Sequence, residues 1–327
     1  MIHSTSYYPG LDLLKFILAI LIIAAHTQLF EELPSIHLII SPIEGSAVPT
    51  FFAISAYLFF QRINHCNSNN ESYAILKKNI KRLLTIFCLW YILMLPMTYF
   101  QFFSVATLKE TIYAILSTCT FYGYWFFKAL IINTIILYIC RNKNTLLVAS
   151  FLFFLIYIFW SYNYIFNYCK ISISPYYSFY YHTFYFFIGA LIARYQPFIH
   201  SPKITVLFIL YIGTIILSLN SLLFPICRLI FPFILIILFK KLANNIKKQN
   251  LLQMRSLSIL LYTTQFMIIW LYNNLCNYCL DSTSDIYLFL QHSITRFIVV
   301  LSIALGISLL ILKLEKKPTL SFLQKLH

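Results

Sequence analysis

Long apolar segments recur along the whole chain, and only short polar connections separate them. About 20 apolar residues is the length at which an α-helix crosses the hydrocarbon core of a bilayer. Such a helix satisfies its backbone hydrogen bonds internally, which lipid cannot do for it. Of all residues, 61% are hydrophobic and 10% are charged, and a soluble domain of this composition cannot keep its apolar surface from water. The sequence therefore predicts an all-α, polytopic transmembrane helical bundle.

Ten apolar segments can be distinguished. They cover residues 12–30, 47–62, 83–103, 124–140, 145–161, 177–194, 204–220, 223–239, 256–274 and 287–312. The boundary between the seventh and eighth is the least distinct, because Pro225, Arg228 and Pro232 interrupt it. No soluble extension, internal repeat or cleavable signal is visible. We therefore expect one membrane-embedded domain over residues 1–327.

Lysine and arginine gather on one side of the predicted membrane. With a cytoplasmic N-terminus, alternate connections and the two ends hold 19 of the 24 Lys and Arg residues. Cytoplasmic loops are enriched in these residues, so the distribution predicts ten spans with both termini in the cytoplasm. The net charge of +15 then reflects topology and contact with anionic lipid, and does not indicate nucleic acid. We expect a multi-pass protein of the inner (plasma) membrane.

The first apolar segment contains two candidate functional residues, Lys15 and His26. Eleven residues of α-helix advance about 16 Å and return to within about 20° of the starting direction. A cation at the cytoplasmic boundary thus lies below an imidazole near the outer boundary, and Asp12 can pair with Lys15 from one turn away. The alternative is that Lys15 reaches to the lipid interface and His26 merely marks the helix end.

A basic cluster precedes the third apolar segment at its predicted cytoplasmic end. It consists of Lys77, Lys78, Lys81 and Arg82. Cations three and four residues apart share one face of a helix, and together they could bind the phosphates of a cytosolic ligand. The alternative is a topological anchor of the kind that most membrane proteins carry on the cytoplasmic side.

The second and fourth segments hold weaker candidates. Ser55 lies among small residues that let helices approach closely, so it could donate a hydrogen bond to a neighbouring helix. Tyr124 and Trp125 stand where aromatic residues commonly mark a membrane interface. Lys128 lies about one turn into the fourth segment, and the sequence leaves open whether it faces the protein interior or reaches outward.

Motifs of several other protein classes are missing from the sequence. There is no phosphate-binding loop, nucleophile elbow or nucleic-acid module. Cys276 and Cys279 form a single C-x-x-C without a second pair. We therefore expect no metal site, and a disulfide between these two cysteines is left as an alternative.

Six segments, in this order, resemble the acyltransferase-3 family of integral membrane O-acyltransferases. GLDLLKFILAILIIAAH at 10–26 has the family's basic residue, ten intervening residues and then a histidine. AVPTFFAISAYLF at 47–59 is similar to its second helix, usually written F-F-x-I-S-G-Y. The others are KKNIKRLL at 77–84, YWFFKALI at 124–131, FYFFIGALIAR at 184–194 and SILLYTTQFMI at 258–268. They are spread from residue 10 to residue 268, so the resemblance covers most of the chain.

The resemblance implies transfer of an acetyl or related short acyl group from cytosolic acyl-CoA to a hydroxyl of a cell-surface or exported glycan. His26 would act as the general base. The donor phosphates would be bound by Lys15, Lys78, Lys81 and Arg82, and the acceptor would be contacted or supported by Ser55, Tyr124, Trp125 and Lys128. Acetyl-CoA or a similar acyl-CoA is a substrate here, and no permanently bound cofactor is expected. The expected partners are these substrates and the lipid bilayer.

Five positions depart from the family pattern. Lys15 stands where arginine is usual, and lysine cannot make arginine's two-pronged contact with phosphate. Ala56 replaces a glycine and Gln265 a frequent histidine. Ser46 and Asn79 stand where many relatives have arginine. These departures bear on the donor site and the substrate more than on the fold.

A transporter or flippase of a lipid-linked glycan precursor is the second hypothesis. Lys128, Arg228 and Arg296 lie in or beside predicted spans, and prolines interrupt spans seven and eight, as in transporters with broken helices. The sequence shows no inverted repeat, which counts against this class. A glycan polymerase would be expected to have large outer loops, and here they are short. Turnover of acyl-CoA by the purified protein separates an acyltransferase from a transporter.

Overall fold

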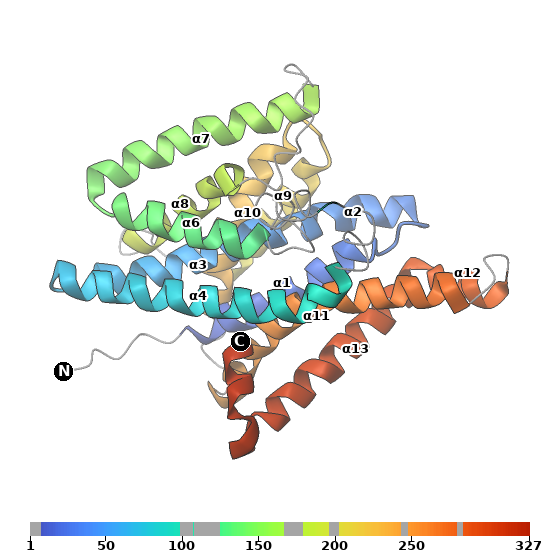
Figure 1. The fold of residues 1–327 in the computed structure, drawn as a ribbon. Helices are drawn as coiled ribbons and strands as arrows, with labels where there is room; N and C mark the ends of the chain where they lie inside the picture. The colour runs from blue at the N-terminus through green and yellow to red at the C-terminus, as the bar shows by residue number, and fades with distance from the viewer. Residues whose placement is uncertain are drawn as a thin grey trace. The chain divides into compact units, whose positions relative to one another are not determined.

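The computed structural model describes residues 8–98, 107, 125–166, 179–195, 203–242, 248–279 and 284–327. Within these ranges every regular element is a helix, as Figure 1 shows. The all-α prediction is therefore confirmed for the part of the chain that is described. Tyr124, one of the predicted site residues, lies outside these ranges.

The chain divides into two compact units that interleave in sequence. Unit 1 comprises Met1–Tyr8 and Pro49–Leu242, and unit 2 comprises Pro9–Val48 and Ala243–His327. Unit 2 thus combines the first helices of the chain with the last ones. A single membrane-embedded domain over the whole chain stays a prediction.

Unit 2 is organised around the contact of its first helix with a long C-terminal one. α1 (Pro9–His26) packs along α11 (Lys248–Cys279), and α11 packs along α13 (Ser293–Leu314). Leu11, Leu14, Leu18 and Ile22 of α1 are buried at helical spacing. The remaining elements are α2 (Pro34–Gly45), the first residues of α3 (Ala47–Asn64), α12 (Asp285–Gln291) and the 3₁₀-helix η6 (Pro318–Leu326).

Unit 1 contains the remaining helices. They are most of α3, α4 (Asn69–Thr98), α6 (Trp125–Ile139), α7 (Lys143–Phe166), α8 (Phe179–Tyr195), α9 (Ile204–Ser218) and α10 (Phe224–Leu242). α8 packs against α6, α7 and α10, while α9 packs against α10. A Cβ atom built on Gly189 of α8 would lie 1.9 Å from the carbonyl oxygen of Ala53 of α3. The close approach of α8 to α3 therefore depends on the absence of a side chain at Gly189.

Five helical stretches in the described part of the chain are long and apolar enough to span a membrane. They are Pro9–His26, Pro34–Asn64, Lys143–Asn163, Gln253–Tyr278 and Ser293–Leu314, and Trp125–Ile139 and Ile204–Ser218 are shorter apolar helices. Each of the ten predicted segments falls largely on a helix of the structure. Ten spans and two cytoplasmic termini stay predictions.

The helix boundaries differ from the sequence prediction at three places. Residues 34–45, expected as a loop, form α2, whose length of 12 residues is too short for a span. The last predicted segment is broken at His292, whose ψ of 131° separates α12 from α13. α4 begins at Asn69, well before the third apolar segment at residue 83, and the basic cluster lies on this helix as expected.

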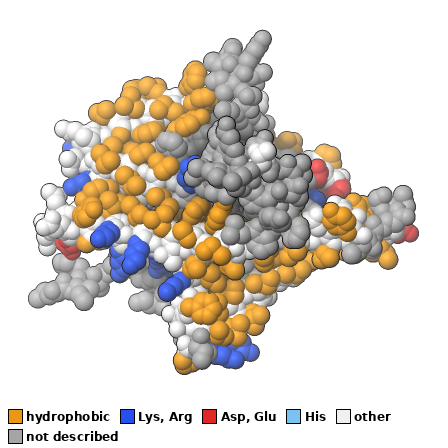
Figure 2. Space-filling view, in the orientation of Figure 1, with side chains coloured by type: hydrophobic (Ala, Val, Ile, Leu, Met, Phe, Trp, Pro, Cys, Tyr) orange, Lys and Arg blue, Asp and Glu red, His pale blue; other side chains and the backbone are white. Residues whose placement is uncertain are grey.

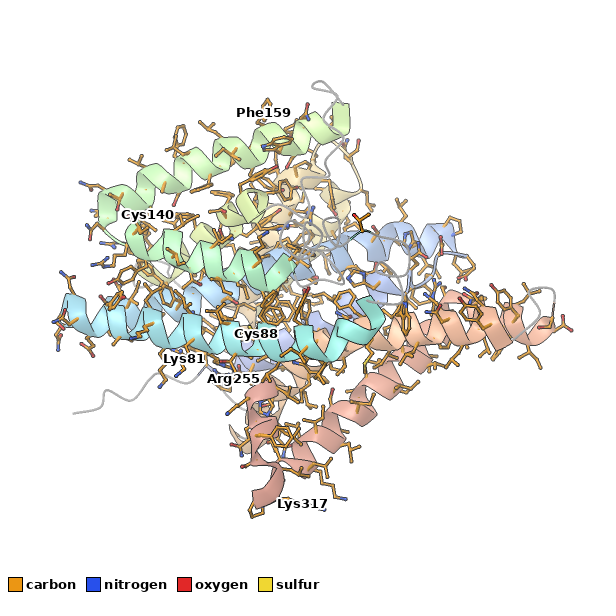
Figure 3. All side chains as sticks on the ribbon, viewed as in Figure 1. Lys81, Cys88, Cys140, Phe159, Arg255 and Lys317 are labelled. Atoms are coloured by element: carbon orange, nitrogen blue, oxygen red, sulfur yellow. The ribbon has the colours of Figure 1, made fainter. Side chains whose placement is uncertain are left out.

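α7 exposes a largely apolar surface. Its exposed side chains include Leu147, Val148, Phe151, Leu152, Leu155 and Phe159. Figure 2 shows the hydrophobic side chains spread over this helix, and Figure 3 shows Phe159 on its outer side. Apolar surface of this extent is unfavourable in water and favourable in lipid. The chain is therefore a membrane protein.

Candidate functional site

Lys15 lies in the first half of α1, where it has a close carboxylate partner. Its Nζ is 3.6 Å from Oδ1 of Asp12, and the two side chains are only 14% and 7% exposed. The predicted pairing one turn apart is therefore confirmed. Asp12 also stands in the first turn of α1, where a negative charge is favoured by the helix dipole.

His26 is the last residue of the same helix. α1 runs without a break from Pro9 to His26, so the spacing that relates Lys15 to His26 applies to the folded chain. The imidazole is exposed and packs edge-to-face on Phe266 of α11, with 4.8 Å between ring centroids. The aromatic contact with Phe266 thus holds the ring against α11 at the end of α1.

Backbone hydrogen bonds define how α1 ends just after His26. Leu29 N–H donates to Ala24 O at 3.0 Å, and Gln28 N–H donates to Ala25 O at 3.3 Å. This pair of bonds is a Schellman motif, in which Thr27 is the C-cap and Gln28 takes the left-handed position. The φ of Gln28 is accordingly 53°.

The residue after the C-cap is normally glycine, but here it is Gln28. Contacts around Thr27 stabilise the turn in place of a glycine. Arg296 of α13 donates to Thr27 O from Nε at 3.0 Å and from Nη2 at 2.6 Å. A cation at a helix C-terminus also complements the helix dipole. From the sequence alone, Arg296 is only a charged residue beside a predicted span. Its contact with Thr27 is not visible there, because the two residues are 269 positions apart in the chain.

The start of α13 is held in turn by the segment that follows α1. Glu32 Oε1 accepts from Ser293 N–H at 2.7 Å, and Glu32 Oε2 accepts from the Ser293 hydroxyl. Burial alone would raise the pKa of Glu32, but the hydrogen bonds from Ser293 and the charge of His292 outweigh it, so the pKa is lowered. Glu32 therefore acts as an N-terminal cap for a helix at the other end of the chain.

Gln265, which stands where relatives often have histidine, is completely buried next to the His26 contact. Its Nε2 donates to Tyr262 O at 3.1 Å. Its Oε1 has no hydrogen-bond partner among the described residues. Gln265 directly precedes Phe266 on α11, so the residue that differs from the family pattern adjoins the one that supports His26.

The predicted donor residues on α4 lie in unit 1. Lys78 and Lys81 are exposed, and Arg82 is half-buried. Figure 3 places Lys81 two turns before Cys88 on this helix. Lys15 and His26 belong to unit 2.

Trp125 of α6 lies in an aromatic group around a buried histidine. The rings of Trp125 and His182 are 4.7 Å apart, and Phe52 stacks on His182 at 5.0 Å with an interplanar angle of 14°. Sequence reasoning identified Trp125 but gave His182 no role, because nothing in its spacing relates it to the other two. Of the other predicted acceptor residues, Ser55 is half-buried and Lys128 is exposed.

The residue after His182 on α8 belongs to a buried pair of polar side chains. Thr183 donates to Asn133 Oδ1 of α6 at 2.7 Å, and both residues have no exposed surface. Asn133 Nδ2 has no hydrogen-bond partner in the described part of the chain. The contact between α6 and α8 thus contains both a buried histidine and a buried hydrogen-bonded pair.

Metal-ligating clusters do not occur among the residues that the structure describes. Cys276 is a buried free thiol, which argues against its disulfide with Cys279.

The comparison with protein families gives one match, which covers nearly the whole chain. Residues 8–313 match the acyltransferase-3 family model, described as an acyltransferase domain. The matched region includes α1, the basic cluster of α4 and the Arg296 contact with Thr27. No curated protein and no solved structure matches the chain significantly.

Proposed function

This chain belongs to the acyltransferase-3 family, and from that membership we propose that it transfers an acetyl or related short acyl group from cytosolic acyl-CoA to a hydroxyl of a cell-surface or exported glycan. The family makes the protein a membrane acyltransferase. The observation that carries the proposal is His26, an exposed imidazole at the end of a continuous helix with Lys15 eleven residues earlier.

His26 suits the role of general base. The glycan hydroxyl is a poor nucleophile until its proton is removed, and a neutral imidazole nitrogen can accept that proton as the attack begins. The hydroxyl oxygen attacks the thioester carbonyl as its proton passes to His26. The C–O bond forms, the C–S bond breaks, and the proton passes to the departing thiolate of coenzyme A. The products are an O-acyl glycan and free coenzyme A.

The donor phosphates fit the cations of α4 better than Lys15. The charge of Lys15 is already offset by Asp12 at 3.6 Å. Lys78 and Lys81 are exposed on a helix face that also carries Arg82. Arginine and lysine are the usual ligands of phosphate, and several on one helix provide the charge for a polyphosphate. In this proposal Lys15 supports the donor from α1, and Lys78, Lys81 and Arg82 hold its phosphates.

The acceptor residues are proposed from the aromatic group at the start of α6. Trp125 is half-buried beside His182, and aromatic faces are apolar platforms for sugar rings. Lys128 is exposed three residues later on α6, where it could donate to glycan hydroxyls. Ser55 and Tyr124 complete the proposed acceptor group.

The transporter hypothesis loses much of its support. Of the three cations that favoured it, Arg296 is bonded to the end of α1. Arg228 lies over the ring of Phe224, 5.4 Å from its centroid, within one helix. These two contacts give Arg296 and Arg228 structural roles that do not require a transport path.

Substitution of His26 tests the proposal directly. We expect His26→Ala to lower glycan acylation in cells, and acyl-CoA turnover by the purified protein, by about 100-fold or more, as loss of a general base does. His65→Ala is the matched control, because His65 is exposed in the connection between α3 and α4 and has no proposed role. Full activity of His26→Ala at a normal protein level would remove His26 from the mechanism.

A further inference from the structure

Four residues connect the end of α1 to the start of α13 in both directions. We call Thr27, Glu32, Ser293 and Arg296 the α1–α13 clamp. Arg296 donates twice to Thr27 O, and Glu32 accepts from both the N–H and the hydroxyl of Ser293. Phe30 N–H also donates to Ser293 Oγ at 3.1 Å. Each helix end is therefore capped by a residue that belongs to the other segment.

The segment after His26 needs such support because of its backbone conformation. Gln28 has a φ of 53° and Phe30 a φ of 63°. This left-handed conformation is unfavourable for residues other than glycine. It persists only where surrounding contacts enforce it. The clamp contacts the backbone of Thr27, which directly precedes Gln28, and the backbone of Phe30 itself. It therefore stabilises a turn that the local sequence alone does not favour.

We propose that Arg296 is a positioning residue for His26, an inference that rests on the proposed function of His26 as the base. Thr27, whose carbonyl Arg296 binds, is the residue directly after His26. Without the guanidinium, the Schellman turn is free to unwind, and the last turn of α1 unwinds with it. A base displaced by about 1 Å from its reacting proton loses on the order of 100-fold in rate.

The contacts of Arg296 distinguish this role from substrate binding. Besides the two bonds to Thr27 O, Nη2 lies 3.3 Å from Gln28 Oε1 and 3.9 Å from Glu31 Oε2. The guanidinium side chain is only 15% exposed. Its donors are directed at the backbone and side chains of the turn rather than at open space, so Arg296 acts through the turn and not on a ligand.

The test compares Arg296→Gln, Arg296→Lys and His26→Ala in the purified membrane protein. For Arg296→Gln we expect a kcat about 10- to 100-fold below wild type, with the KM for acyl-CoA within about twofold. Arg296→Lys, which keeps one donor and the charge, should recover part of kcat. Arg255→Gln, a half-buried arginine elsewhere in unit 2, is the control and should leave kcat unchanged.

Ser293→Ala keeps the inference testable if Arg296→Gln does not fold. It removes one small hydroxyl that links Glu32 to Phe30, and we expect a smaller loss of kcat, about two- to tenfold, at unchanged KM. Wild-type kcat in both Arg296→Gln and Ser293→Ala, while His26→Ala is inactive, would overturn the positioning role alone. A raised KM for acyl-CoA with normal kcat in Arg296→Gln would also overturn it. Full activity in His26→Ala would instead overturn the proposed function.

Discussion

At the scale of single residues, Glu32 gives the α1–α13 clamp a dependence on pH. Its folded pKa is below the ordinary carboxyl value because Ser293 donates to both oxygens. A depressed pKa means that the stabilisation is complete above the ordinary pKa and is lost as pH falls through the lowered folded value. We expect Glu32→Ala to cost about 1 kcal/mol or less at pH 7, since Glu32 is exposed and solvent weakens the interaction.

Thermal unfolding of the purified protein in detergent measures this effect. The difference in Tm between wild type and Glu32→Ala should be present at pH 7 and shrink below about pH 4.5, where free carboxyl groups protonate. Glu32→Gln is the matched control, because it keeps the shape without a titratable group. A Tm difference that stays constant through the acidic range would show that the carboxylate charge has no part in capping α13.

Single residues also show which parts of the site were predictable from sequence. The Asp12–Lys15 pair could be predicted because both residues lie one turn apart on one helix, and helix geometry alone brings them together. The Arg296–Thr27 contact could not, since it depends on tertiary packing between segments 269 positions apart. The same holds for His182, whose neighbours Phe52 and Trp125 come from two other helices.

At the scale of elements, the α3–α8 contact in unit 1 sets a strict limit on side-chain size. A Cβ atom at Gly189 would meet Ala53 O at 1.9 Å and its carbonyl carbon at 2.8 Å. Backbone atoms cannot move aside as a flexible side chain can, so Gly189→Ala must push the helices apart. We expect Gly189→Ala to destabilise the protein by about 3 kcal/mol, at the upper end of the range for overpacked sites, and Gly189→Leu to prevent accumulation of folded protein.

Gly213 of α9 is the matched control for this prediction. A Cβ atom there would meet nothing within 4 Å, and alanine favours helix over glycine by about 1 kcal/mol. Gly213→Ala should therefore keep or raise Tm while Gly189→Ala lowers it, as measured by thermal unfolding in detergent. Equal Tm values for the two variants would show that α3 and α8 are not in backbone contact.

The helices themselves were largely predictable, whereas their ends were not. Apolar length locates the segments, because only a helix satisfies the backbone in lipid. It does not indicate α2, whose 12 residues are too few to span a membrane, or the break at His292 within an apolar run. That break is where Ser293 is bound by Glu32, a contact between distant parts of the sequence.

At the scale of the whole molecule, the division into units separates the predicted site residues. Lys15 and His26 belong to unit 2, and the basic residues of α4 belong to unit 1. Each unit joins segments distant in sequence, with α1 against α11 in one and α3 against α8 in the other. The sequence could identify these residues by type and spacing, but it could not assign them to units, because hydropathy describes each helix without its neighbours.

Topology is the property of the whole molecule on which the proposed reaction depends. With ten spans and a cytoplasmic N-terminus, the connection after α6 faces the cytoplasm and that after α9 faces outward. An epitope inserted at Asn220, which is exposed between α9 and α10, should bind antibody in intact spheroplasts. One inserted at Asn142, which is exposed between α6 and α7, should bind only after permeabilisation, as should a tag after His327. The charge bias favours this arrangement because moving basic loops across the membrane is unfavourable.

Detection of the Asn142 and His327 epitopes in intact spheroplasts would show that the protein has the opposite orientation in the membrane. His26 would then be near the cytoplasmic surface and Lys81 outside, where no acyl-CoA is available to it.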